Sequence, residues 1–539
     1  MPDYTIILLL ATGIITAFTI YWLTSLELDT DTVETILIPI RFSQPPIVNL
    51  HAMGLAIATD WFSSVMSPFA AVIAMNFAAL AIFIGIFIKI SLDWSHDLAL
   101  SGALLLLVVV SSAFRIVTAT LDDNLIPVML LLVTIFGLSR NKATTTSVSF
   151  AGCLFGVAVF FHIELALFLP VGLGCLWARR KLRDALAFGL TSCVMFFLGF
   201  LVFQFSYSTI PNTVVTGVAN SFAYLESENW FIFAGDFYPT RVIKWLFTAC
   251  AYFFFNSMPL PPSSLKSLVH GGWDTSTMIA GGMFVVALVA IIWIVFAAFV
   301  RSFYVSKKCK IDQLLVLGTF FVFAVFAVCY EFRNPERWIN AIPFLLLSFA
   351  LPIKVPSHRW FWIANNRTIL ALVSIICVSF LIFAGLHGGL TEHHLKKTEV
   401  KCISEHLEPE DCIMLGFRPL SNFFIGYYYS GLVFIAATQA PVSEWHVFEN
   451  GSIKGLSQFC SFHSNEVKEH IKRKSGRIFI DNDLHISSRV QCSDFFPQPQ
   501  CATINQLDVC GRVFSVGDIA QLVNAPSPYP VHQDKSAPQ

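Results

Sequence analysis

The sequence predicts a polytopic α-helical membrane protein with a small extramembrane α/β domain near its C-terminal end. The 539 residues are 55% hydrophobic and only 13% charged, with a mean hydropathy of +0.68. A soluble globular domain usually carries about twice that charged fraction. Apolar stretches recur up to residue 386, and a polar region follows. The net charge of −1 gives no indication of a nucleic-acid partner.

About eleven stretches approach the roughly 20 residues that a membrane-spanning helix requires. The first lacks the basic region and the small-residue cleavage site of a signal peptide, so we expect it to be retained. Residues 242–262 are ambiguous, because their Pro-rich end allows either a re-entrant hairpin or a twelfth span. The expected spans lie near residues 5–25, 66–90, 98–118, 124–139, 146–162, 163–178, 185–206, 276–300, 312–330, 338–353 and 367–386.

Clusters of Lys and Arg predict the orientation, since such clusters accumulate in short cytoplasmic loops. If the clusters are cytoplasmic, the intervening loops and everything after residue 386 face outward. The lack of clear eukaryotic retention signals favours the bacterial inner membrane, with a periplasmic C-terminal domain, over the endoplasmic reticulum membrane, which stays an alternative. The clusters lie at 140–142, 179–183, 301–310 and 354–359, and the outward loops at 26–65, 119–123, 207–275 and 331–337.

The polar region predicts one α/β domain. Residues 1–387 form the expected membrane domain, residues 388–523 the α/β domain and residues 524–539 a disordered tail rich in Pro, Ser and Gln. An even number of cysteines in this region allows a disulfide framework, and the absence of a CxxC spacing makes zinc binding the weaker alternative. These cysteines are Cys402, Cys412, Cys460, Cys492, Cys501 and Cys510.

Carboxylates gather on the predicted outer side of the membrane. Asp29 and Asp31 follow the first span, where a membrane enzyme would keep a base that acts on lipid-borne substrates. Asp122 and Asp123 occupy the short turn between the third and fourth spans, where they could also cap the next helix. Carboxylates are common in external loops without any role, so both groups are candidates.

Arginines accompany these carboxylates. Arg115 lies two helical turns before Asp122 and therefore on the same face. Arg333, Glu336 and Arg337 crowd the outer turn before the span near 338–353. A guanidinium can bind a lipid phosphate bidentately. The alternatives are a salt bridge for Arg115 and interfacial anchoring for the second group.

Three further polar residues lie near outer helix ends, and we assign them no role beyond substrate contact. They are His51, His162 and Glu164.

The combination resembles the GT-C superfamily of membrane glycosyltransferases, in particular the polyprenyl-phosphate-sugar-dependent enzymes related to protein O-mannosyltransferases and aminoarabinose transferases. The resemblance covers about the first 390 residues. The usual Asp-Glu pair of the first loop is Asp-Thr-Asp here, so the corresponding aspartate stays open. The matching positions are Asp29 or Asp31, Asp122 or Asp123, and Glu336-Arg337-Trp338 with Pro343.

The resemblance implies an inverting transferase that moves a hexosyl or pentosyl group from a polyprenyl-phosphate donor to an acceptor hydroxyl on a lipid, glycan or protein. Asp29 or Asp31 would accept the hydroxyl proton. Arg337 and Arg115 would stabilise the charge on the leaving phosphate, with a divalent cation as the one cofactor that this chemistry suggests. A transporter or flippase of lipid-linked sugars and a ligase or polymerase of lipid-linked glycans are the alternatives.

Overall fold

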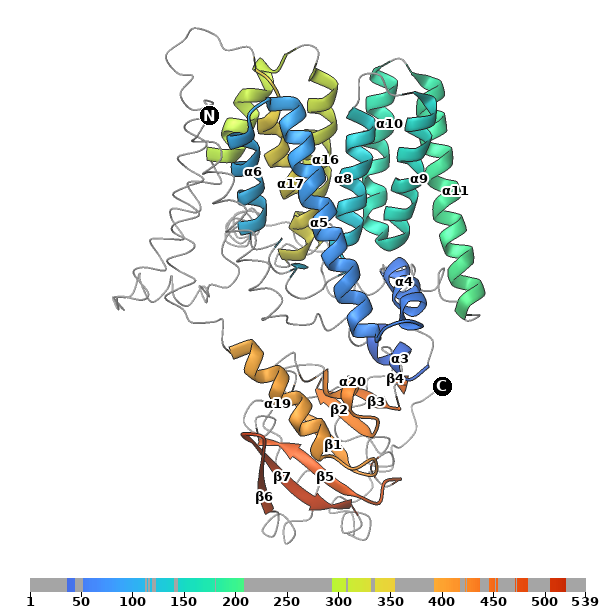
Figure 1. Cartoon of the computed structure of the whole chain (residues 1–539), viewed down its shortest axis with the longest axis vertical. Helices are drawn as coiled ribbons and strands as arrows, with labels where there is room; N and C mark the ends of the chain where they lie inside the picture. Colours follow the sequence, from blue (N-terminus) through green and yellow to red (C-terminus); the bar gives the residue numbers. More distant parts are fainter. Residues whose placement is uncertain are drawn as a thin grey trace, which may run out of the picture. The chain divides into compact units, whose positions relative to one another are not determined.

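The computed structural model contains a helical part and a C-terminal mixed sheet (Figure 1). The chain divides into two compact units, which we describe separately. The first comprises Met1–Leu26 and Val48–Gly389, and the second comprises Glu27–Ile47 and Leu390–Gln539. The structure describes residues 36–43, 52–111, 114, 117–118, 123–139, 144–179, 181–207, 293–306, 309–330, 335–353, 392–416, 422, 424–436, 445–450, 452–453, 471, 473–482 and 505–519.

Apolar helices make up the described part of the first unit. Three of them are long and apolar enough to cross a membrane, namely Pro68–Ser95, Leu182–Tyr207 and Lys310–Ala327, and several apolar helices are shorter. The main helices are α4 (Met53–Ser63), α5 (Pro68–Ser95), α6 (Leu98–Val110), α8 (Leu125–Ser139), α9 (Thr145–Phe161), α10 (Leu169–Ala178), α11 (Leu182–Tyr207), α16 (Lys310–Tyr330) and α17 (Ile342–Leu347).

These helices coincide with most of the predicted spans between residues 66 and 353. Six of the predicted ranges agree with described helices to within a few residues. The predicted spans at 5–25 and 367–386, and the ambiguous stretch at 242–262, lie outside the described residues. The total number of spans therefore stays a prediction.

Side-chain caps determine where several helices begin. Ser67 Oγ accepts a hydrogen bond from the N–H of Ala70 at 3.2 Å, and Pro68 supplies the first helical residue of α5. Asp97 caps α6 in the same way, and Thr144 caps α9. Each cap satisfies a backbone N–H that the first helical turn leaves without a partner.

Two glycines bring α9 and α11 into close contact. A Cβ added at Gly152 would lie 2.1 Å from Thr191 Oγ1, and one at Gly156 would lie 2.3 Å from the carbonyl oxygen of Ser192. These glycines are four residues apart, the GxxxG spacing that places both on one helix face. A larger residue at either position would separate the two helices.

One end of the helical unit collects basic residues. Arg179, just after α10, donates to the carbonyl oxygen of Leu138 at 2.6 Å and pairs with Asp312 of α16 at 2.8 Å. Thr145 at the start of α9 donates to Asp184 of α11. The predicted basic clusters at 179–183 and 301–310 thus meet at the same end, as expected for loops on one side of a membrane.

The predicted outer loop at residues 26–65 contains helix α4. The N–H of Ala52 donates to the carbonyl oxygen of Phe161 at 3.0 Å, and Tyr207 Oη donates to Asp60 at 2.8 Å. Helix α4 therefore packs where α9 and α11 end (Figure 1). The sequence analysis did not predict this helix within the loop, because eleven residues are too few for a span, and span length was the criterion applied.

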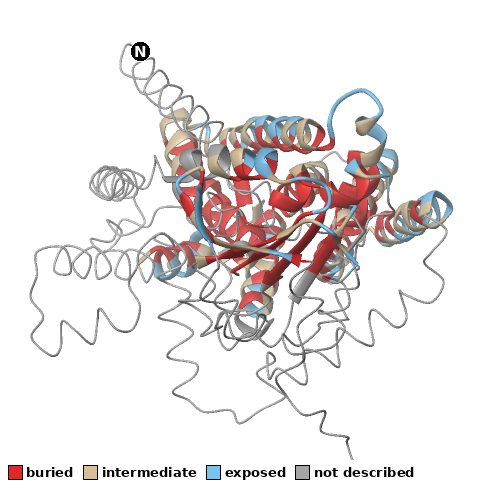
Figure 2. Ribbon diagram, turned by 90° about the horizontal axis from the view of Figure 1, so that it is seen from below, coloured by how far each residue is buried: buried red, intermediate tan, exposed pale blue. Residues whose placement is uncertain are grey.

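The second unit contains a seven-stranded mixed sheet, as predicted for a C-terminal α/β domain. Strand β1 is central and pairs in parallel with β2 and β5, so that Ile413 lies opposite Val433 and Phe479. These three strands are almost completely buried (Figure 2). The sheet order is β4-β3-β2-β1-β5-β7-β6, with β1 (Cys412–Leu415), β2 (Leu432–Ala436), β3 (Trp445–Glu449), β4 (Ser452–Ile453), β5 (Arg477–Asp481), β6 (Asn505–Val509) and β7 (Arg512–Asp518).

A buried polar network closes the carboxyl ends of β1 and β5. Arg512 donates to both carboxylate oxygens of Asp481 and, at 2.8 Å, to Asn422 Oδ1. Asn422 in turn donates to the carbonyl oxygen of Gly416, just after β1. All three side chains are buried, so each charge and amide has its partner inside the domain.

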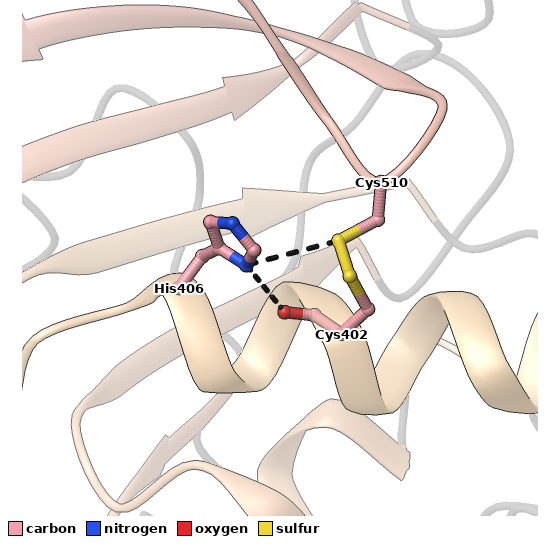
Figure 3. Close-up of side chains that lie close together, drawn as sticks. All are labelled: Cys402, His406 and Cys510. Atoms are coloured by element: carbon pink, nitrogen blue, oxygen red, sulfur yellow. Dashed lines mark hydrogen bonds between the residues drawn. A yellow bond between two sulfur atoms is a disulfide. The ribbon is translucent and has the colours of Figure 1, made fainter.

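A disulfide joins helix α19 (Glu392–His406) to the last hairpin. Cys402 of α19 pairs with Cys510, which occupies the two-residue turn between β6 and β7 (Figure 3). Cys510 and Gly511 both have positive φ, at 57° and 85°, as a tight hairpin turn requires. Cys412 departs from the predicted framework, because it is a free thiol buried in β1. The remaining three late cysteines lie outside the described residues.

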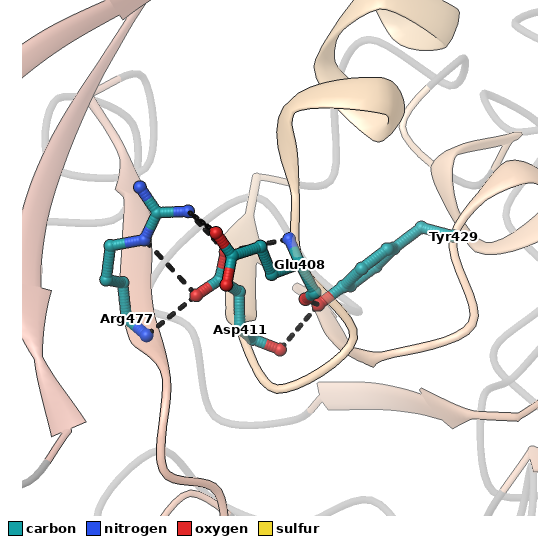
Figure 4. Close-up of polar contacts among 4 residues, drawn as sticks. All are labelled: Glu408, Asp411, Tyr429 and Arg477. Carbon is teal, nitrogen blue, oxygen red and sulfur yellow. Dashed lines mark hydrogen bonds and ion pairs between the residues drawn. The ribbon is translucent and has the colours of Figure 1, made fainter.

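A second polar cluster fixes the turn before β1. Asp411 accepts hydrogen bonds from the backbone N–H and the guanidinium of Arg477, and Tyr429 Oη donates to the carbonyl oxygens of Glu408 and Asp411 (Figure 4). Burial, followed by the nearby carboxylates, raises the pKa of Tyr429. The hydrogen bond that Arg477 donates to Asp411 raises the pKa of Arg477, so this ion pair persists to high pH.

Thiol accessibility tests the disulfide. In the native protein without reductant, we expect Cys402 and Cys510 to resist alkylation and to become reactive once the disulfide is reduced. Cys412 should react only after denaturation, because it is buried and burial raises the pKa of its thiol. Peptide mass spectrometry reports each site separately. Alkylation of Cys402 in the untreated native protein would contradict the pairing.

Tyr429 predicts a loss of stability in alkali. A folded-state pKa above the ordinary value of about 10 means that its stabilising contribution is complete below pH 10 and is lost as pH rises toward the folded value. The difference in thermal midpoint between wild type and Tyr429→Phe should therefore shrink above about pH 10. A difference that stays constant from pH 8 to pH 11 would exclude this role.

Candidate functional site

Most of the predicted site residues lie outside the described part of the chain. Two are described with their side chains, Asp123 and Arg337. Glu336 lies in a described element, but its side chain is not described. The predicted residues outside the described ranges are Asp29, Asp31, Arg115, Asp122 and Arg333.

Arg337 forms a buried ion pair with Glu164. Its Nη1 lies 2.8 Å from Glu164 Oε1, and the two side chains are 14% and 5% exposed. Glu164 lies in a short 3-10 helix, Ile163–Phe168, that follows α9 directly. A buried charge pair is stabilised by its Coulomb attraction, and removing one partner leaves the other uncompensated.

His162 completes the group at the end of α9. It is 1% exposed, and its Nδ1 lies 3.8 Å from Glu164 Oε2. The backbone of His162 is extended, with φ −150° and ψ 108°, which ends α9 and turns the chain into the 3-10 helix. Glu164 therefore lies between an imidazole and a guanidinium.

The sequence around Arg337 explains why its position is fixed. Arg337 lies in the 3-10 helix Pro335–Asn340, and the residues after it are buried without interruption from Trp338 to Leu351. Pro343 is the second residue of α17, in the first helical turn, where its missing N–H requires no partner. The apolar run holds the backbone, so the guanidinium projects from a packed element.

Asp123 lies two residues before the start of α8. The carbonyl oxygen of the neighbouring Asn124 accepts the first helical hydrogen bond, from the N–H of Val128 at 3.2 Å. Asn124 also donates from its side chain to Asp123 Oδ1 at 3.2 Å. Helix α8 packs against the 3-10 helix that carries Arg337. Both candidate motifs with described side chains therefore belong to neighbouring elements of the helical unit.

This arrangement presents a charged donor group that can bind an oxyanion. A guanidinium carries five N–H groups in a plane, and its charge is permanent. Glu164 lies 2.8 Å from the guanidinium and partly balances its charge. Sequence reasoning missed this role of Glu164, although one signal existed. An acidic residue directly after a span end, within an apolar stretch, is costly unless it is paired.

A separate group in the second unit has ligand atoms close enough for a metal ion. Among the described residues, the sulfurs of Cys402 and Cys510 and a ring nitrogen of His406 lie within 4.8 Å of one another. Both sulfurs belong to the disulfide, which removes the thiolates that zinc would require (Figure 3). We therefore interpret this group as a disulfide with an adjacent imidazole, and not as a metal site.

Comparison with known proteins shows the fold. No protein-family model and no curated protein sequence matches the chain. The structure is similar to ArnT from Cupriavidus metallidurans in the apo state, with a TM-score of 0.52 and 12% identity over 96% of this chain and 100% of that chain. It is also similar to the same protein bound to undecaprenyl phosphate, with a TM-score of 0.50 and 10% identity over 94% of this chain and 98% of that chain.

This similarity shows an ArnT-like fold over nearly the whole chain, in agreement with the resemblance that the sequence motifs indicate. It extends over the C-terminal domain, which resembled no family at the sequence level. The apolar helices and this fold together identify an integral membrane protein.

The Glu164–Arg337 pair predicts a large stability loss on neutralisation. Glu164→Gln removes the carboxylate that pairs with the largely buried guanidinium of Arg337, and breaking a buried pair typically costs about 3–5 kcal/mol. The exposed Lys89–Asp93 pair of α5 is the control, and Asp93→Asn should cost about 0–1 kcal/mol. Thermal unfolding in detergent compares the two variants. Equal losses would show that the Glu164 pair is not effectively buried.

Proposed function

We propose that the protein is a membrane glycosyltransferase that moves a sugar from a polyprenyl-phosphate donor to an acceptor hydroxyl on the outer face of the membrane. The observation that carries this proposal is the match of nearly the whole chain to the fold of a protein crystallised with undecaprenyl phosphate, a polyprenyl phosphate. The proposed setting is a bacterial inner membrane with a periplasmic C-terminal domain.

The proposed reaction is a single inverting displacement. The acceptor oxygen forms a bond to the anomeric carbon, the bond from that carbon to the phosphate oxygen breaks, and the lipid phosphate leaves with the electron pair. Asp29 or Asp31 accepts the hydroxyl proton. An ordinary aspartate, with a pKa of about 3.9, is a weak base, and partial desolvation would raise that value. Asp122 or Asp123 supplies the second acidic motif.

Arg337 is the proposed partner of the leaving phosphate. The guanidinium stabilises negative charge that grows on the phosphate as the sugar departs, and its benefit is larger where water is scarce. Glu164 holds Arg337 in place through the 2.8 Å ion pair. Arg115, Arg333 and Glu336 belong to the same proposed phosphate-binding group. A divalent cation would supply additional charge neutralisation.

Turnover of a labelled donor tests these assignments. Purified protein is supplied with vesicles that contain radiolabelled undecaprenyl-phosphate sugars, together with a membrane extract as the source of acceptor hydroxyl groups, and loss of sugar from the lipid is followed. We expect Asp29→Asn or Asp31→Asn to lower turnover about 10²–10⁴-fold, the usual contribution of a general base. Arg337→Ala should lower it by about 10²–10³-fold, as loss of one oxyanion donor does.

Matched variants separate charge from geometry. Arg337→Lys keeps the charge but loses the planar fork, so it should recover only part of the activity. Full turnover in Asp29→Asn, Asp31→Asn and Arg337→Ala would overturn the site assignment. If wild type instead carries the intact lipid-linked sugar across the bilayer without cleavage, the protein is a flippase. Extension of a lipid-linked glycan would indicate a ligase or polymerase.

A further inference from the structure

A short segment of the first predicted outer loop is folded into the C-terminal unit. Ile36, Leu37 and Ile38 are completely buried, and Ile40 is 8% exposed. Helix α3 (Ile38–Arg41) packs against α20 (Ile425–Tyr428) and the edge strand β4. We call residues 36–41 the anchor segment. Its burial removes a continuous apolar run from water, which favours the docked state.

The anchor segment contacts an aromatic surface. The guanidinium carbon of Arg41 lies 4.9 Å from the centre of the Tyr427 ring, a cation–π distance. Tyr427 stacks on Phe424 with ring centres 5.1 Å apart. A Cβ added at Gly426 would lie 3.1 Å from Ile38 Cδ1, so the isoleucine packs directly on the backbone of α20. Apolar packing and one cation therefore hold the segment.

The anchor segment lies close in sequence to the proposed catalytic base. Asp31 precedes Ile36 by five positions, and Asp29 precedes it by seven. A chain spans at most about 3.6 Å per residue, so Asp31 lies within about 18 Å of Ile36 in any conformation. The docked segment therefore limits where the carboxylate can be.

We infer that the C-terminal unit positions the first outer loop for catalysis. The positioning residues are those of the anchor segment and the residues of α20 that it contacts. This inference rests on the proposed function and assigns the C-terminal unit a part in it. Docking fixes the backbone just after the candidate base, and it reduces the conformational freedom that the loop must lose when substrate binds.

Hydrogen exchange on the full-length protein tests the docking without any assay of activity. Wild type should protect the amides of residues 36–41, apart from Pro39, which has no N–H. Ile38→Asp should expose these amides together with those of α20, because it places a charge in an apolar contact surface. The amides of β5 in the same unit are the internal control for folding. Rapid exchange of residues 36–41 in wild type would overturn the inference.

Kinetics test the positioning. Arg41→Ala leaves the buried isoleucines in place, and it should lower kcat roughly tenfold to a hundredfold with little change in KM, because a misplacement of about 1 Å can cost about 10²-fold. Arg41→Lys keeps a cation over Tyr427 and should recover most of the loss. Lys401→Ala, which removes an exposed cation from α19, is the matched control and should leave kcat unchanged.

The outcomes are distinguishable. If residues 36–41 lose protection in Arg41→Ala or Ile38→Asp while kcat is unchanged, the segment is only structural and the inference fails. If wild type cleaves no lipid-linked sugar, the proposed function fails and the positioning role fails with it. The exchange data then still report whether the segment is docked.

Discussion

Polar groups at the helix ends of the membrane-embedded unit need hydrogen-bond or ion-pair partners within the protein, because bulk water is not at hand. This requirement accounts for much of the described structure. Arg301 shows it most directly, because its buried guanidinium donates to the carbonyl oxygen of Phe349 at 2.7 Å and lies over the Phe349 ring. Arg179 likewise donates to the carbonyl oxygen of Leu138 in the last turn of α8. The basic residues that indicate membrane orientation therefore also satisfy helix termini.

The same constraint explains the candidate site. At the opposite helix ends, α9 is followed by an extended residue and a 3-10 helix that carries Glu164 into a buried position. Arg337 balances this charge, and both residues are fixed by apolar segments. An ion pair in such surroundings contributes little net stability. For the proposed phosphate-binding role, the pair supplies a guanidinium of defined position.

Hydropathy was sufficient to predict where most described spans begin and end, because long apolar runs have few alternatives in a bilayer. It could not predict α4 or the short helix at 38–41, whose eleven and four residues depend on tertiary contacts with distant segments. The pairing of Glu164 with Arg337 could not be predicted from the sequence either. The two residues are 173 positions apart, and short motifs do not show which residues of distant helices lie next to each other. Asp29 and Asp31 remain predictions from sequence alone.

The C-terminal sheet shows how a common ligand-binding position can be closed. Open α/β sheets bind ligands beyond the carboxyl ends of their parallel strands, where the connections diverge. Here Arg512 and Asp481 fill that position at β1 and β5, and Asn422 links them to the loop after β1. This internal network favours a structural role for that edge of the sheet.

The pairing of Cys402 with Cys510 also has a consequence for biogenesis. The two residues are 108 positions apart, and four other cysteines lie between them in the chain. Because the chain is synthesised from its N-terminal end, Cys402 can meet each of those thiols before Cys510 has been made. Oxidation in order of synthesis would join the wrong partners, so the native bond requires that oxidation follow completion of the domain or that early bonds be exchanged. Formation of the native disulfide therefore depends on the order of oxidation as well as on the fold of the domain.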